Sequence, residues 1–231
     1  MTGWKAKLKR RIPGPILNRV LLSFPSLYET SLVNFESNLD CRGLDDLLEC
    51  LEGASGLPGD LIELGSSRCG TAIILARWLR ARHIPKIVHA CDSFQGFDLK
   101  ELRQERALSL SNPKDDAHAS TSYEYVTRKL QRLGLSEAVR PIKGYFQETL
   151  PGLQGSYCLA LVDCDLKESM TFCARWVFER LVVGGWMAFD DYVSEDYRGA
   201  KLAVDEFVEE FRGRLTDFGV RRRLYFVRKD S

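Results

Sequence analysis

Acidic side chains follow two apolar segments in the second half of this 231-residue chain. Tyr157–Asp163 (YCLALVD) leads into Asp165, and Trp186–Asp190 (WMAFD) leads into Asp191. If these segments are neighbouring parallel strands, their ends lie about 5 Å apart, at the edge where open α/β sheets bind ligands. So many carboxylates repel one another unless a cation lies among them, and ligands that are all oxygen atoms favour Mg²⁺ or a similar hard ion. The spacing therefore predicts a metal site, although Asp165 could instead only cap the next helix.

A glycine-containing turn lies earlier in the chain, in the stretch Asp60–Gly70 (DLIELGSSRCG). Its apolar start is typical of a buried strand, Gly65 and Gly70 interrupt the pattern, and the apolar residues that follow have helical spacing. This is the opening unit of a nucleotide-binding sheet, in which free N–H groups at the helix start attract an anionic group. Asp92 ends the next predicted strand, 27 residues after Gly65, where it can accept hydrogen bonds from both hydroxyls of a ribose. The combination predicts a nucleoside ligand.

Alternating strands and helices must position these groups. Lys86–Cys91 and Val139–Lys143 are further predicted strands, and Val220–Lys229 is predicted to be the last strand of an edge hairpin. Amphipathic patterns between the strands predict helices over 43–53, 123–133 and about 197–212. Strands that alternate with helices in this way indicate a doubly wound, mostly parallel α/β sheet.

The composition suits one large α/β domain (59–231) that follows an N-terminal arm and helical cap (1–58). The 33 basic and 32 acidic residues leave a net charge of +1, so no global field favours nucleic acid or a membrane surface. No apolar run has the length of a membrane span, and the N-terminus lacks a signal-peptide core, so we expect no stable membrane insertion. The 7 cysteines include no C-x-x-C pair, which favours a reduced, cytoplasmic protein.

Two segments have roles that the pattern leaves open. Residues 1–20 carry several basic side chains and could lie on anionic lipid, but Pro13 and Pro15 interrupt a long amphipathic helix and favour a solvated arm. The polar stretch 98–122 is long for a compact domain, which is typical of either a functional lid or a disordered loop.

Five short motifs follow one another between about Gly59 and Phe211: E-x-G, D-S-F-x-G, K-G-x-F-x-x-T-L-P, D-x-D-x-x-x-S and G-G-x-x-x-x-D-D-Y. Their order resembles the macrocin O-methyltransferase family of class I S-adenosylmethionine-dependent methyltransferases. The resemblance implies a Rossmann-like, seven-stranded, mostly parallel sheet with helices on both faces and an N-terminal helical appendage. It further implies S-adenosylmethionine and Mg²⁺ as cofactors, a small-molecule hydroxyl as the acceptor, often on a natural-product sugar, and a possible homodimer.

The resemblance also implies roles for individual residues. Those expected to bind the methyl donor are Glu63, Gly65, Ser66, Ser67, Gly70, Asp92, Ser93, Phe94, Tyr145, Phe146 and Asp163. The metal triad of the family matches Asp163, Asp190 and Asp191.

Methyl transfer to a hydroxyl group also needs a base, because a neutral alcohol is a poor nucleophile near pH 7. The family's proposed base is an aspartate of the metal cluster, which points to Asp163 here. Lys167 stands where the family commonly has tyrosine. It could act as a base if its pKa falls, or it could be a solvated residue at the start of a helix.

Two other functions remain open. Tyr125 and Lys129 form the Y-x-x-x-K pair of a short-chain dehydrogenase, so an NAD(P)-binding oxidoreductase is one alternative, although no G-x-x-x-G-x-G loop is present. The other is a methyltransferase-fold protein that only binds a partner, which predicts a degraded donor loop or carboxylate cluster. His83, His89 and His118 show no metal-ligand spacing, and we expect them to be structural or surface residues.

Overall fold

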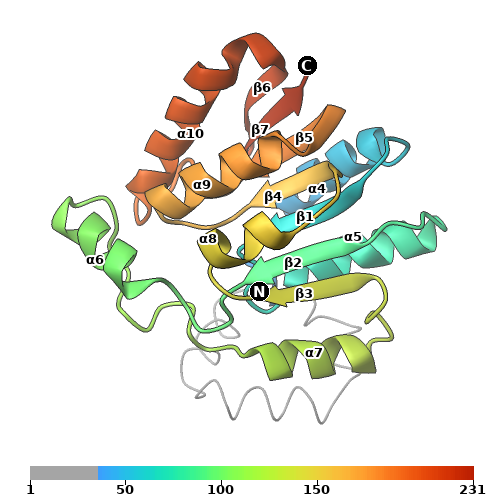
Figure 1. Cartoon of the computed structure of the whole chain (residues 1–231), viewed down its shortest axis with the longest axis horizontal. Helices are drawn as coiled ribbons and strands as arrows, with labels where there is room; N and C mark the ends of the chain where they lie inside the picture. The colour runs from blue at the N-terminus through green and yellow to red at the C-terminus, as the bar shows by residue number, and fades with distance from the viewer. Residues whose placement is uncertain (1–35) are drawn as a thin grey trace.

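Seven strands form one sheet within residues 36–231, the part of the chain that this computed structural model describes (Figure 1). The strands are β1 (Asp60–Leu64), β2 (Val88–Asp92), β3 (Val139–Lys143), β4 (Tyr157–Val162), β5 (Leu181–Phe189), β6 (Leu215–Arg221) and β7 (Leu224–Lys229). Their order is β3-β2-β1-β4-β5-β7-β6, with β7 antiparallel to both of its neighbours and all other pairs parallel. The prediction of a mostly parallel sheet is therefore confirmed. The order reverses between β1 and β4, and ligands of such sheets bind beside that point.

Helices cover both faces of the sheet, as predicted. The described helices are α4 (Cys41–Ala54), α5 (Gly70–Ala81), α6 (Leu99–Ala107), α7 (Tyr123–Arg132), α8 (Phe146–Thr149), α9 (Lys167–Phe178) and α10 (Arg198–Phe211), with short 3-10 turns at Leu150–Gly152 and Arg212–Arg214. One apolar cluster joins α4, α5 and α7 to the sheet, and a second joins α9 and α10 to the opposite face. Adjacent residues of β1 divide between them, because Leu61 belongs to the first cluster and Ile62 to the second.

Helix α4 packs against the sheet through its apolar face. Asp40 caps the helix by accepting a hydrogen bond from the backbone N–H of Gly43 at 2.9 Å. Leu47 and Leu51 are completely buried in the same apolar cluster as Leu61 of β1. The predicted basic arm, residues 1–20, lies outside the described residues.

The C-terminal hairpin differs from the prediction of one strand over Val220–Lys229. The chain turns at Arg222 and Arg223, so the predicted segment contains the end of β6 and all of β7. No glycine or proline marks this turn in the sequence, and Arg222 adopts the left-handed conformation itself, with φ +50°. The hairpin lies at the edge of the sheet, as predicted, and β6 is the outermost strand because β7 is inserted between β5 and β6.

None of the helices in residues 36–231 combines the length and the apolar character that crossing a bilayer requires.

Candidate active site

A cavity lies at the carboxyl ends of β1, β2 and β4, the edge at which open α/β sheets bind their ligands. Of the residues expected to bind the methyl donor, those that line this cavity are Gly65, Ser67, Asp92, Ser93, Tyr145, Phe146 and Asp163. The cavity also contains Asp165, so the predicted nucleoside site and the predicted carboxylate cluster share one space.

The loop between β1 and α5 forms the floor of the cavity. Gly65 has φ +97°, and a Cβ atom at this position would lie 1.7 Å from the carbonyl oxygen of Asp163. Its N–H donates to the carbonyl of Cys91 at 2.9 Å, which ties the loop to the end of β2. Glycine is therefore required here because two backbone segments touch, in addition to any approach of a ligand.

Asp92 lies at the tip of β2 and organises the same loop. Its carboxylate accepts one backbone hydrogen bond from Ser67 at 2.7 Å and one from Phe94 at 2.6 Å. Burial raises the pKa of Asp92, and these two hydrogen bonds oppose the shift. Each carboxylate oxygen keeps a further lone pair, so the position remains suitable for the hydroxyls of a ribose.

Four other residues expected at the donor site lie beside the cavity without lining it. Ser66 is buried and donates its hydroxyl to the carbonyl of Glu63 at 3.3 Å, and Glu63 is itself 2% exposed. The ring of Phe94 packs 5.7 Å from that of Tyr123, within the core. Gly70 makes room for the passing backbone of Glu36, since a Cβ there would lie 2.5 Å from its carbonyl carbon.

Glu63 provides a prediction about pH. Burial, opposed mainly by a hydrogen bond from Ser66, raises the pKa of Glu63 from 4.5 to about 8. The folded protein thus holds this proton more tightly than the unfolded chain, and stability is lost as pH rises between these values. Between pH 5.5 and pH 8.5 the wild-type protein should therefore lose about 3 kcal/mol in free energy of unfolding that Glu63→Gln does not lose. Urea unfolding at the two pH values measures this difference, and the exposed Glu52→Gln should behave like wild type.

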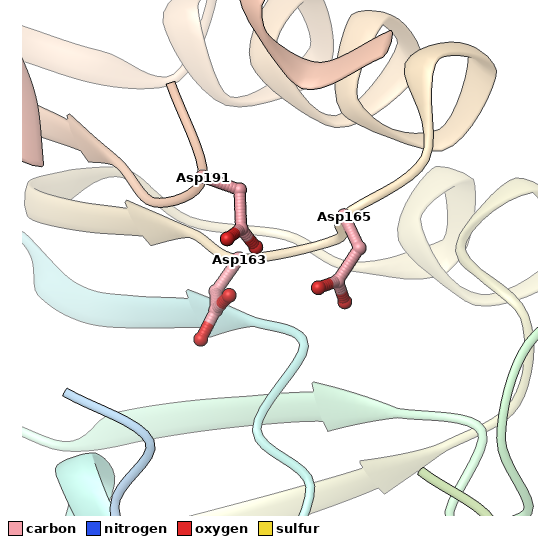
Figure 2. Close-up of side chains that lie close together, drawn as sticks. All are labelled: Asp163, Asp165 and Asp191. Atoms are coloured by element: carbon pink, nitrogen blue, oxygen red, sulfur yellow. The ribbon is translucent and has the colours of Figure 1, made fainter. Parts of the chain in front are cut away.

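Three carboxylates converge where β4 and β5 end (Figure 2). Asp163 follows β4, Asp165 lies in the loop to α9, and Asp191 follows β5; one oxygen atom of each lies within 4.8 Å of the others. Burial and the nearby carboxylates raise the pKa of Asp163 and of Asp165 well above the usual range, and raise that of Asp191. A divalent cation relieves this repulsion, and an all-oxygen donor set fits Mg²⁺.

Asp190, expected in the metal triad, has a different partner. It is 2% exposed, and both of its oxygens accept hydrogen bonds from the guanidinium of Arg223, at 2.9 and 2.6 Å. Asp165 occupies the third position of the cluster instead. Sequence patterns could not identify Arg223, because it is one of three consecutive arginines at an unmarked turn.

Lys167, a candidate base, points away from the carboxylates. Its ammonium group forms an ion pair with Glu206 of α10 at 2.6 Å. It lines a separate surface groove together with Phe172 and Trp176 of α9. Lys167 therefore lines this groove and not the cavity that contains the carboxylates.

An aromatic cluster that sequence reasoning did not identify closes one side of the cavity. Phe97 and His118 line it, with ring centres 5.1 Å apart, and His118 shares a hydrogen bond of 3.0 Å with the hydroxyl of Tyr197. Asp163 and Asp165 line the same cavity, so the cluster lies across this space from the carboxylates. Burial, followed by the charge of Asp165, raises the pKa of Tyr197. His118 was expected to be structural or on the surface, and no spacing in the sequence connects it with Tyr197.

The polar stretch 98–122 forms α6 and a loop, and α6 is fixed to the first turn of α9. Glu101 accepts hydrogen bonds from the backbone N–H and the hydroxyl of Ser169, at 2.8 and 2.6 Å. Glu105 accepts from the backbone N–H of Lys167, at the start of α9, and from the hydroxyl of Ser111. Negative charge is favourable at a helix N-terminus, so these two glutamates hold the segment next to the carboxylate cluster.

Tyr125 and Lys129, the pair that suggested a dehydrogenase, lie outside the cavity. Lys129 is completely buried and forms an ion pair with Glu36, which also accepts a hydrogen bond from the hydroxyl of Tyr125 at 2.8 Å. Both side chains are part of the protein core.

Comparison with known proteins agrees with the geometry. The profile of the macrocin-O-methyltransferase (TylF) family matches residues 39–215. An enzyme of Streptomyces olivaceus, 8-demethyl-8-(2,3-dimethoxy-α-L-rhamnosyl)-tetracenomycin-C 4′-O-methyltransferase, is 34% identical over 75% of this chain and 66% of its own length. Demethyldecarbamoylnovobiocin O-methyltransferase of Streptomyces niveus is 30% identical over 77% of this chain and 70% of its own.

Solved structures extend the agreement to three dimensions. The O-methyltransferase NovP superposes with a TM-score of 0.75 and 27% identity, over 85% of this chain and 83% of that protein. The calicheamicin methyltransferase CalS11 has a TM-score of 0.68 at 18% identity, over 91% and 89% of the two chains, and supports the fold alone. The family profile covers most of the chain, including α4 and both strands that carry the carboxylates. The chain belongs to the macrocin O-methyltransferase family, whose members in this comparison are O-methyltransferases of natural-product biosynthesis.

Proposed function

We propose that this protein transfers a methyl group from S-adenosylmethionine to a hydroxyl group of a small molecule, with Mg²⁺ in the carboxylate cluster. The observation that carries the proposal is the shared cavity, in which Asp92 and Ser67 face the same space as Asp163 and Asp165. A nucleoside-type donor and a metal-binding acceptor site have to be adjacent if a methyl group is to pass between them.

In the donor half of the cavity, S-adenosylmethionine would be bound mainly by backbone groups and by one carboxylate. Asp92 would accept hydrogen bonds from the ribose, and Tyr145 and Phe146 provide aromatic surface for the adenine. The contact of Gly65 with the end of β4 keeps this half at a fixed distance from Asp163. Such positioning of the reactants contributes much of the rate in a direct displacement.

The acceptor half would be organised by the three carboxylates. Asp163, Asp165 and Asp191 present oxygen atoms that suit Mg²⁺. When bound, S-adenosylmethionine supplies an electrophilic methyl group, and Mg²⁺ stabilises negative charge on the acceptor oxygen. Asp163 is the carboxylate that we propose to take the hydroxyl proton, since Lys167 is occupied by Glu206.

For the acceptor we propose a hydroxyl of a sugar attached to a natural product. The relative from Streptomyces olivaceus is named for a rhamnosyl tetracenomycin, and another, from Micromonospora griseorubida and 29% identical, is named mycinamicin III 3″-O-methyltransferase. The aromatic rings of Phe97 and His118 at the cavity wall offer apolar surface against which the face of a sugar ring could pack.

The first test is calorimetric titration with S-adenosylhomocysteine, with and without Mg²⁺. S-adenosylhomocysteine, the product of methyl transfer, should bind, and NAD should not. Asp191→Asn should retain product affinity within about threefold, because Asp191 lies outside the donor half, but should lose methyl transfer to the acceptors named for the relatives. Binding of NAD in place of the product would favour an oxidoreductase. Tight product binding with no transfer to any glycoside would favour a protein that only binds a partner.

A further inference from the structure

His118 lies on the wall of the cavity and is held in place from two sides. Its Nε2 shares a hydrogen bond of 3.0 Å with the hydroxyl of Tyr197, which directly precedes α10. On the other side, Gly96 lets the backbone approach closely, since a Cβ atom at Gly96 would lie 2.9 Å from the carbonyl oxygen of Ala117. The ring of Phe97 packs against the imidazole with 5.1 Å between the ring centres. The loop after β2 and the loop before α10 therefore fix the position of His118 together.

Backbone contacts join the two segments that form this wall. Ser111 pairs with Tyr197 in an isolated antiparallel bridge, and the N–H of Asn112 donates to the carbonyl of Asp196 at 3.1 Å. His118 itself adopts the left-handed backbone conformation, with φ +59°. A residue other than glycine adopts this conformation at some cost in free energy, and such costs are concentrated at functional sites. The surrounding contacts thus hold the imidazole in a defined position on the cavity wall.

One nitrogen of the imidazole is available to a ligand. Within residues 36–231, the ring has the single hydrogen bond between Nε2 and Tyr197, and Nδ1 has no partner. Desolvation lowers the pKa of His118 from 6.5, although the charge of Asp92 opposes the shift, so the ring is mostly neutral above pH 7. Burial raises the pKa of Tyr197, so its phenol keeps its proton. In either tautomer, Nδ1 then donates or accepts one hydrogen bond, and a hydroxyl group can match both cases.

We propose that His118 is a specificity-determining residue that binds a second hydroxyl of the acceptor sugar, and that Tyr197 is a positioning residue that holds the imidazole. This inference rests on the proposed function, because it concerns the acceptor of that reaction. Asp163 and Asp165 line the same cavity, on the side where the hydroxyl to be methylated would bind. An acceptor with several hydroxyls on one ring can present one to the carboxylates and another to His118. The pair thus favours a polyhydroxylated ring over an acceptor with a single hydroxyl.

The experiment is an NMR titration of the full chain with S-adenosylhomocysteine bound. The probe is methyl α-L-rhamnoside, which contains the sugar named for the relative from Streptomyces olivaceus, and the control is 2-methoxytetrahydropyran, a similar ring without hydroxyls. The chain has three histidines, so the imidazole ¹⁵N signals are few, and the loss of one in His118→Gly identifies that residue. The rhamnoside should move the Nδ1 signal of His118 and leave that of His83, an exposed residue after α5, unchanged. The control ring should move neither signal.

Two substitutions test the roles of the pair, with rhamnoside affinity measured from the signals of the sugar. His118→Gly should weaken rhamnoside binding by about 3- to 10-fold, the usual effect of one neutral hydrogen bond, and should keep product affinity within about threefold. Glycine adopts the left-handed backbone without strain. Tyr197→Phe should weaken rhamnoside binding to a similar extent and also move the Nε2 signal of His118, because the ring loses its partner. Tyr192→Phe is the matched control, since its hydroxyl bonds to Asp205 at 2.9 Å and does not line the cavity, and it should change neither.

The outcomes separate the alternatives. A protein that binds S-adenosylhomocysteine, but whose His118 signal ignores the rhamnoside or responds equally to 2-methoxytetrahydropyran, would overturn the inference and leave the proposed methyl donor in place. Equal rhamnoside affinity in Tyr197→Phe and Tyr192→Phe would overturn the positioning role. A protein that does not bind S-adenosylhomocysteine would contradict the proposed function itself, and this inference with it.

Discussion

Gly65→Ala should lower the free energy of unfolding by roughly 3–5 kcal/mol and abolish binding of S-adenosylhomocysteine. A methyl group at this position meets the carbonyl oxygen of Asp163 at 1.7 Å, and alanine strongly disfavours the observed φ of +97°. Because the contact is between two backbones, no rotation of a side chain can relieve it. The loop has to move away from β4, and both halves of the proposed site move with it.

Gly53→Ala is the matched control for this prediction. Gly53 lies within α4, and an added Cβ would have nothing within 4 Å. Alanine should stabilise the helix there by roughly 0.5–1 kcal/mol. Thermal and urea unfolding of both variants, together with product titration, gives the comparison. A Gly65→Ala protein that melts like wild type and binds the product would show that the backbone contact is not needed.

Glu36→Gln should lower the free energy of unfolding by roughly 3–5 kcal/mol, the usual cost of breaking a buried ion pair from one side. Glu36 is 3% exposed and accepts hydrogen bonds from Arg68 at 3.0 Å and from Lys129, two cations that are themselves buried. Arg68 belongs to the loop after β1 and also donates to the carbonyl of Ser120 at 3.0 Å. Weakening this cluster should therefore loosen the donor loop and reduce product affinity as well.

Exposed Glu137→Gln is the control for Glu36→Gln, since it makes the same chemical change on the surface. It should change the free energy of unfolding by less than about 0.5 kcal/mol. A Glu36→Gln protein that resists denaturant as well as wild type and still binds the product would show that the other contacts of the two cations are sufficient.

The fold was predictable because its signals are local. The apolar run of β4 indicates a strand buried on both faces, and the glycine turn before α5 occurs as expected. Asp92 lies at the tip of β2, as expected from its place at the end of the predicted second strand. The prediction that Asp163 and Asp191 lie at the same edge of the sheet required only the assumption that β4 and β5 are neighbours, which is confirmed.

The rest of the site depends on contacts between residues that are far apart in the chain. Arg223 pairs with Asp190 because β7 enters the sheet between β5 and β6, and no pattern in the sequence gives that order. Lys167 lies beside the carboxylates in sequence, yet its ammonium group pairs with Glu206 on another helix. The role of Gly70 could not be predicted either, since the backbone that it accommodates is that of Glu36, which is distant in the sequence.

The position of β7 has a consequence for how the protein is made. Asp190 is added to the growing chain well before Arg223, which follows 33 residues later. At about 5–20 residues per second, that interval is roughly 2–7 s. During this time β5 lacks its antiparallel neighbour, and a carboxylate destined for the interior has no counter-charge. The edge of the sheet that carries the carboxylate cluster is therefore complete only after the final hairpin has emerged from the ribosome.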